Sequence, residues 1–392
     1  GNLKIQMKVN GRIVQEDRTS SLIHNIPKTV SFISQYITLH PGDLIFTGTP
    51  GETAALKSGD ICEVVLEGVG TLRNPVVAQQ PAAVDLIAHS GGVEQAGFQF
   101  IDTPGEYLDL ISGGRNVLRF VYKQRDGSSA DTHYLTFKPY HHVFDPATGT
   151  VFLSAGAHPN TKEFLYPHHR GLFFGFNRIS FQGKSADIWH GKDGVHSSCL
   201  RIEDQRIEDD QASHTAVIGW FGSDGQQFAT ERRTVSVRCP NGGTMIEWST
   251  QLSTDLPLVR LDGDPQHAGF HFRANQEVAM QTSKQTYYVR PDGPGKLGET
   301  RNWDSKTMDP RTINLPWNAM SFEVQGKRYT VLRIPHPNNP GETRGSERDY
   351  GRFGDFFEYD LTPDKPLELR YRIWVQEGSM TQQQCDRLTW SG

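Results

Sequence analysis

The feature that most constrains the fold is a long succession of short segments in which apolar and polar residues alternate. Turn residues separate these segments at short, even distances, and no helical pattern intervenes. Alternation of β-branched and aromatic residues at period two is typical of strands whose two faces differ. The sequence therefore predicts a large antiparallel β-sandwich or a barrel. The segments are "YLDLIS", "VLRFVYKQ", "YLTFKPY", "GTVFLS", "LFFGFN", "HTAVIGWFG", "RRTVSVR", "TMIEWSTQLS", "AGFHFRA", "YTVLRIP" and "LELRYRIWVQEG".

The first 77 residues show a different pattern of apolar and polar residues. "LKIQMKVNGRIVQ" alternates on both sides of Asn10-Gly11, which predicts a hairpin. "IPKTVSFISQYI" places apolar residues at helical intervals, with Pro27 suited to a first turn. Short strands follow, and "AQQPAAVD" has the small, polar composition of a linker. We therefore expect a mainly β chain with a domain at 1–77, a linker at 78–85 and a sandwich domain at 86–392.

Composition excludes several classes of protein. The net charge of -5 and the lack of a basic stripe give no reason to expect a nucleic-acid partner. No apolar run approaches the roughly 18 residues of a membrane helix. The four cysteines lie far apart without a C-x-x-C pair, which favours isolated thiols. We expect a soluble protein, cytoplasmic if no signal peptide has been removed, whose partner is a small molecule or a glycan.

The ordered motifs VNG, Q, T, L-x-P-G-D, TGTP, L-x-x-GD and GTL-x-N run through residues 3–77. In this series the region resembles the C-terminal half of the fumarylacetoacetate hydrolase family. The resemblance implies hydrolysis or decarboxylation of 2-oxo or diketo acids with Mg²⁺ or Mn²⁺. It also implies that Thr49, in the TGTP turn, contacts the substrate carboxylate.

The same resemblance implies that the metal ligands are missing. The family holds its ion on an E-x-E pair and a later Asp, all upstream of the matched segment, and hard cations need several oxygen ligands together. We therefore expect Mg²⁺ or Mn²⁺ only if the upstream half of the domain is present, and no other cofactor. A half-domain exposes sheet edges, so a homo-oligomer through this region is expected.

A second resemblance covers about residues 105–376. A KPY segment, a PHHRGL segment and a following D-x-W with a nearby histidine resemble the PmoA-like (methane oxygenase PmoA) family. The family label implies methane oxidation by a membrane-bound enzyme. This chain cannot span a membrane, so the label is not taken as an activity. The number of strands and the use of His and Arg are similar to galactose mutarotase and its polysaccharide-lyase relatives, which implies a supersandwich fold.

Histidines and arginines gather on the segments of this region. In "QHAGFHFRA" the period-two rule puts His267, His271 and Arg273 on one face, opposite Phe270 and Phe272. His267 and His271 would lie about 13 Å apart along a strand, too far to share an ion, so no metal ligand is assigned. We predict a polar cleft whose other lining residues are Arg170, Trp189, His196, Arg333 and His336.

The predicted chemistry is proton transfer on a sugar-like ligand. His168, His169 and His267 are the candidate acids, and Glu358 or Asp355 could supply a carboxylate.

Pro167 and Gly171 flank the pair of histidines and predict a turn, since adjacent residues of a strand point to opposite faces. We expect folding to survive replacement of His169 or Arg170. Trp189 or Trp303 could stack on a sugar face.

The leading interpretation is a carbohydrate-processing or carbohydrate-binding protein. Two alternatives stay open: a metal-dependent hydrolase or decarboxylase of 2-oxo acids through the N-terminal region, and a non-catalytic binding module. The sequence leaves open whether the chain is an enzyme.

Overall fold

The computed structural model describes residues 2–35, 39, 45, 47–48, 56–57, 59–76, 97–158 and 164–390. The chain forms two compact units, Gly1–Gly92 and Val93–Gly392. The predicted linker at 78–85 lies outside the described residues. No helix in the described part of the chain is long and apolar enough to cross a membrane.

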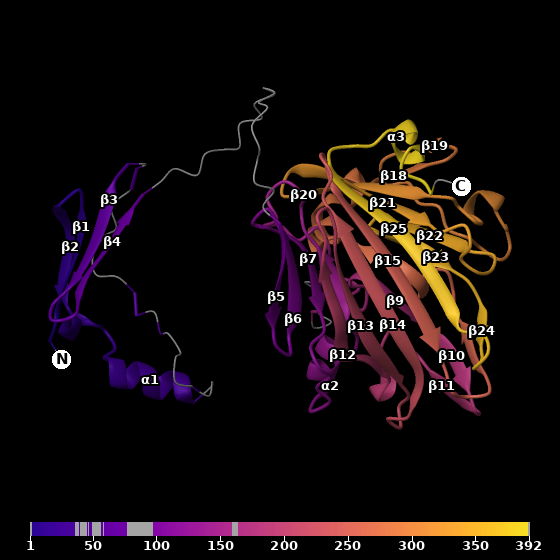
Figure 1. The fold of residues 1–392 in the computed structure, drawn as a ribbon, viewed down its shortest axis with the longest axis horizontal. Coiled ribbons are helices and arrows are strands. Elements are labelled where there is room, and N and C mark those ends of the chain that lie inside the picture. Colours follow the sequence, from indigo (N-terminus) through magenta and orange to yellow (C-terminus); the bar gives the residue numbers. More distant parts are fainter. Residues whose placement is uncertain are drawn as a thin grey trace. The chain divides into compact units, whose positions relative to one another are not determined.

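The first unit is a small antiparallel sheet with one helix (Figure 1). Asn10 and Gly11 both have positive φ (51° and 78°), as the hairpin turn requires, and the predicted hairpin is confirmed. The helix α1 (Ile26–Ser34) starts at Asn25, whose side chain accepts a hydrogen bond from the amide of Lys28. In spatial order the sheet contains β2 (Arg12–Arg18), β1 (Lys4–Val9), β3 (Ile61–Leu66) and β4 (Gly70–Pro75).

The second unit contains two large antiparallel sheets and a smaller one, as Figure 1 shows. The nine-stranded sheet contains β12 (His196–Ile207), β13 (Ala212–Phe221), β14 (Gln227–Arg238), β15 (Thr244–Ser253), β25 (Leu367–Glu377), β21 (Lys327–Pro335), β20 (Asn318–Val324), β18 (Tyr287–Arg290) and β19 (Gly293–Pro294). The eight-stranded sheet contains β22 (Arg344–Arg348), β23 (Arg352–Phe356), β17 (Ala268–Arg273), β9 (Gly171–Phe176), β8 (Tyr140–Val143), β7 (Arg115–Val121), β6 (Tyr107–Ser112) and β5 (Phe98–Thr103).

Shorter elements complete the unit. The four-stranded sheet contains β11 (Lys184–Ala186), β10 (Arg178–Phe181), β16 (Val259–Asp262) and β24 (Tyr359–Leu361). The other helices are α2 (Ala130–Thr136), α3 (Gln382–Asp386), the π-helix η3 (Val278–Thr282) and the 3₁₀ turns η2 (Lys192–Gly194), η4 (Ser283–Gln285) and η5 (Pro310–Thr312); a further 3₁₀ turn, η1 (Thr19–Ser21), belongs to the first unit.

The core lies between the two large sheets. Phe270 of β17 packs on Trp248 of β15 and Tyr371 of β25, with ring centroids 4.5 and 4.4 Å apart. Phe272 belongs to the same buried cluster, so the prediction that Phe270 and Phe272 share a core face is confirmed. Residues at the alternate positions of β9 and β17, among them Phe173 and His271, face the other side of the eight-stranded sheet.

The predicted fold class, mainly β with a large antiparallel sandwich, is confirmed. One predicted strand is wrong in part: the first residues of "YLTFKPY" belong to α2. Ser129 and Thr132 form a reciprocal capping box at the start of this helix, and the capping outweighs the aromatic, β-like composition. The segment "GTVFLS" makes only isolated bridges, Phe152 with Phe144 after β8 and Ser154 with Ala274 after β17, so it does not form one of the predicted strands.

Candidate functional site

Two adjacent histidines point to the same side of the chain because they lie in a turn. Tyr166 has a left-handed backbone with φ of 56°, and its carbonyl accepts a hydrogen bond from the amide of His169 at 3.0 Å. The ring centroids of His168 and His169 are therefore only 4.1 Å apart, whereas adjacent side chains of a strand point to opposite faces. The turn predicted between Pro167 and Gly171 is present.

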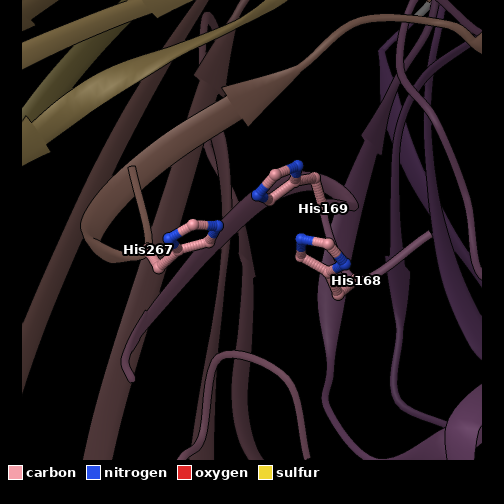
Figure 2. A group of neighbouring side chains, drawn as sticks. All are labelled: His168, His169 and His267. Carbon is pink, nitrogen blue, oxygen red and sulfur yellow. The ribbon is translucent and has the colours of Figure 1, made fainter. Parts of the chain in front are cut away.

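A third histidine enters from the turn that precedes β17. The ring centroid of His267 lies 6.0 Å from that of His168 and 5.9 Å from that of His169. One ring nitrogen from each of the three residues lies within 4.8 Å of the other two. Figure 2 shows the three rings around a common space. The structure thus brings together the three histidines that the sequence analysis named as acid candidates.

His190 extends this group to a cluster of four, which we call the histidine cluster. Its ring centroid lies 4.7 Å from that of His168 and 5.0 Å from that of His267. Its Nδ1 donates to the carboxylate of Asp187 at 2.8 Å. The sequence analysis noted a histidine near the D-x-W segment but did not assign His190 to the site.

The same local structure occurs twice in the histidine cluster. His267 Nδ1 donates to Asp264 at 3.0 Å, so each Asp–His pair is separated by three residues, in a D-x-x-H pattern. Because the aspartate engages Nδ1, Nε2 of His190 and of His267 is left for another partner. Asp264 is itself fixed, since it accepts hydrogen bonds from Asn177 and from the amide of Gln266. The repeated D-x-x-H pattern is the signal that could have identified these aspartates from the sequence.

Burial controls the protonation of the two adjacent histidines. It lowers the pKa of His168 far below the ordinary value, and the nearby charge of His190 lowers this pKa further. Burial, and then the charge of His168, likewise holds the pKa of His169 well below its usual range. Both rings are neutral near pH 7, so each offers one donor and one acceptor.

Several ring nitrogens of the cluster are unpaired within the described part of the chain. The Nε2 atom of His168 and both nitrogens of His169 are buried and find no hydrogen-bond partner among the described residues. Buried polar atoms are nearly always paired, and an unpaired group needs an explanation such as a missing ligand or ion. The unpaired nitrogens therefore make the histidine cluster the candidate binding site.

The carboxyl of Asp264 is ionised. Burial raises its pKa, but hydrogen bonds from His267 and Asn177 and the charge of His267 outweigh burial, and the pKa falls below its usual range. Lys138, from the KPY segment, is fully buried and donates to the carbonyl of Trp189 at 2.8 Å. Burial lowers its pKa well below 10.5.

A cavity of about 640 Å³ adjoins the cluster. His168 and His190 line it, together with His133 and Tyr134 near α2 and the loop through Gly191–Gly194. Tyr166 does not line this cavity; it is 43% exposed, and its ring centroid is 6.2 Å from that of His169. The arrangement offers hydrogen-bonding imidazoles, an exposed aromatic ring and room for a small molecule.

Three predicted lining residues are buried behind the cluster. Trp189 is fully buried and its indole meets His271 edge-on at 4.8 Å, so it has no exposed face for a sugar. His271 contacts the carbonyl of Ala268 at 2.8 Å and Arg352 at 3.1 Å. Arg273 donates to backbone carbonyls, among them that of Ala274 at 3.2 Å. The prediction that these three residues line a polar cleft is wrong, because all three side chains are buried and engaged by protein groups.

Arg170 differs from the expectation most clearly. It is fully buried, and its guanidinium donates to the carbonyls of Pro167 at 3.2 Å, Leu135 at 3.4 Å and Tyr134. Its Cζ atom lies 4.4 Å from the ring centroid of Phe137. Arg170 therefore links α2 to the histidine turn. The premise that Arg170 carries no core packing is wrong, and survival of the fold without it stays a prediction.

The carboxylates proposed from the sequence pair with arginines. Glu358 forms ion pairs with Arg260 and Arg344. Asp355 is buried against Arg333, with an N–O distance of 2.7 Å. Glu358 and Asp355 are thus engaged by arginines. The carboxylates that contact the cluster directly are Asp187 and Asp264.

The remaining predicted residues lie in other settings. His196 stacks on Phe221 at 4.8 Å and contacts the carbonyl of Gly194. His336 packs against Trp390 at 4.6 Å. Trp303 lies under the guanidinium of Arg344. Thr49 lies outside the described residues.

The fold and the site together define a large antiparallel β-sandwich with a partly buried histidine cluster, in which His169 is the buried member. Residues 107–389 match a family described as "Family of unknown function (DUF6807)", and the chain belongs to this family. The resemblance to the PmoA-like family stays a prediction. Residues 1–77 match the family described as "Fumarylacetoacetate (FAA) hydrolase C-terminal".

Curated relatives match the first unit. An uncharacterized protein of Archaeoglobus fulgidus is 49% identical over 75 residues, which are 19% of this chain and 30% of the relative. The mitochondrial oxaloacetate tautomerase FAHD1 of Rattus norvegicus is 46% identical over 71 residues, 18% of this chain and 32% of the relative. The chain thus spans about three tenths of the length of the curated relatives it matches.

A solved structure matches the second unit. The galactose mutarotase related enzyme of Lactobacillus acidophilus covers 72% of this chain and 98% of its own, with 9% identity and a TM-score of 0.32. At this TM-score the likeness carries no argument about the site.

Proposed function

We propose that the sandwich unit is a carbohydrate-binding and carbohydrate-processing unit whose ligand lies against the histidine cluster. The observation that carries the proposal is the convergence of four imidazoles beside a cavity that His168 and His190 line. Among the described residues, buried ring nitrogens of His168 and His169 have no hydrogen-bond partner. Sugar hydroxyls both donate and accept hydrogen bonds, and neutral imidazoles do the same. Tyr166, an exposed tyrosine next to the imidazoles, offers a sugar an apolar ring face and a polar hydroxyl group.

The two Asp–His pairs supply the chemistry. An imidazole that is hydrogen-bonded to a carboxylate through Nδ1 has a fixed tautomer and orientation, and its Nε2 can accept or deliver a proton. His190 with Asp187 and His267 with Asp264 can therefore act as an acid and a base on one ligand. In this proposal His168 and His169 bind the ligand, and the two pairs move its protons.

The proposal is tested by measuring the binding of neutral monosaccharides and of uronic acids to the full chain by saturation-transfer NMR and calorimetry. His169→Ala should weaken the binding by about 1 to 3 kcal/mol, the usual cost of leaving a buried partner unpaired. The matched control is His24→Ala, an exposed histidine of the first unit, which should bind as the wild type does. Sugar binding that is equal in all three proteins would place the ligand elsewhere.

A second candidate function rests on the match of residues 1–77. The family resemblance implies chemistry on 2-oxo or diketo acids, and the rat relative is described as an oxaloacetate tautomerase. The family's metal ligands lie upstream of the matched segment. This activity is therefore proposed only for an assembly in which another chain or segment supplies those ligands.

A further inference from the structure

We propose that His168, His169 and His267 bind a divalent transition-metal ion of the zinc type. Each residue can direct one nitrogen into the common space in Figure 2, and these nitrogens lie within 4.8 Å of one another. Three histidines with one open coordination position form a common type of catalytic zinc site. The inference rests on the proposed function for the use of the ion. With an ion bound, Nε2 of His267 coordinates it, the sugar contacts the open coordination position, and proton transfer is left to His190 with Asp187.

The geometry needs only a small adjustment. Zinc–nitrogen bonds of about 2.1 Å in a tetrahedron place ligand nitrogens about 3.4 Å apart. The rings must therefore close by about an ångström or slightly more from the separation of 4.8 Å. All three histidines lie on turns rather than inside strands, so small rotations of their side chains can close the distance without changing the sheet.

The surroundings of His267 are those of a metal ligand. Metal-bound histidines usually donate their second ring N–H to a carboxylate or a carbonyl, which fixes the ring and makes it a better ligand. His267 Nδ1 donates to Asp264, and Asp264 is held in turn by Asn177 at 2.9 Å. His190 repeats the arrangement with Asp187, and its ring centroid lies 4.7 Å from that of His168 and 5.0 Å from that of His267.

The identity of the donors selects the class of metal. An all-imidazole set suits zinc, copper, nickel and cobalt, whereas magnesium and calcium prefer oxygen ligands. Positive charge from Arg352 and Arg273 acts on His169, and this repels a cation. The carboxylates of Asp187 and Asp264 oppose that repulsion, so the neighbourhood tolerates a dication.

The test is metal binding by the full chain after removal of metals with EDTA. We expect one Zn²⁺ or Co²⁺ per chain by calorimetry and elemental analysis, and visible d–d absorption from the Co²⁺ form. His169→Ala and His267→Ala should lose the site, while His24→Ala, in the first unit, should keep it. Asp264→Asn should keep the ligands but weaken the affinity by about 10- to 100-fold; Asp224→Asn, an exposed residue paired with Lys184, is its control.

The outcomes separate the two proposals. A wild-type chain that binds no ion tightly, or in which His267→Ala and Asp264→Asn leave the affinity unchanged, overturns the metal site. Because an alanine variant could unfold, Asp264→Asn and the wild-type Co²⁺ spectrum decide the question without it. If the chain binds sugars but does not bind an ion, only the metal site is refuted. If it binds an ion but no sugar, only the proposed function is refuted.

Discussion

The neighbours His169 and Arg170 should respond in opposite ways to truncation. Two hydrogen bonds from the buried guanidinium of Arg170, to the carbonyls of Pro167 and Tyr134, contribute about 1.5 to 3 kcal/mol each, and the contact with Phe137 adds about 1 kcal/mol. Burial lowers the pKa of Arg170 to about 10, and Arg170→Ala relieves this desolvation cost. The expected net loss in the free energy of unfolding is about 3 kcal/mol.

His169→Ala removes a side chain whose nitrogens have no described partner, so only packing is lost, about 1 kcal/mol. The assay is urea unfolding followed by tryptophan fluorescence, because all seven tryptophans lie between Trp189 and Trp390 and report on the second unit alone. Arg206→Ala is the control: its side chain is 70% exposed, so its loss should cost about 0.5 kcal/mol or less. An Arg170→Ala variant as stable as this control would refute the structural role of Arg170.

Three further predictions concern other parts of the molecule. Burial lowers the pKa of His214 to about 3, below the unfolded value of about 6.5, so the unfolded chain binds more protons between about pH 3 and 6.5 and stability falls as the pH drops through that window. His214→Phe should remove about 1.4 kcal/mol per pH unit of this slope, measured by urea unfolding across the window, and an unchanged slope would contradict the prediction. With Mg²⁺ or Mn²⁺ the chain should not turn over oxaloacetate in a spectrophotometric assay, since no group of three metal ligands occurs in the described parts of residues 2–76; turnover abolished by Thr49→Ala would show otherwise. Ile26 and Val30 are 55% and 37% exposed on α1, so we expect self-association that Val30→Glu weakens in sedimentation velocity, and a monomeric wild type would rule this out.

Much of the fold could be predicted because strand periodicity is a local property. The alternation in "AGFHFRA" assigned Phe270 and Phe272 to the core without any knowledge of the partner strands. The same rule wrongly predicted a strand at α2, because the capping box of Ser129 and Thr132 starts a helix in this aromatic segment.

The candidate site could be predicted only in part, because some of its features are local in the sequence and others depend on distant segments. His168, His169 and His267 were named by residue type and by the turn residues around them, and the structure brings them together. The burial of Arg170 and Trp189 could not be predicted, because it depends on loops that fold over the outer face of the eight-stranded sheet from distant parts of the chain.

The central claim is that the histidine cluster is the ligand site of the sandwich unit. The most direct measurement is NMR of the imidazole nitrogens in chain labelled selectively on histidine, titrated with neutral sugars and uronic acids. The account predicts that the signals of His168, His169, His190 and His267 shift together while that of His24 stays in place, and that His169→Ala abolishes the shifts. Shifts confined to histidines outside the cluster, or a cluster that responds to none of these sugars, would contradict it.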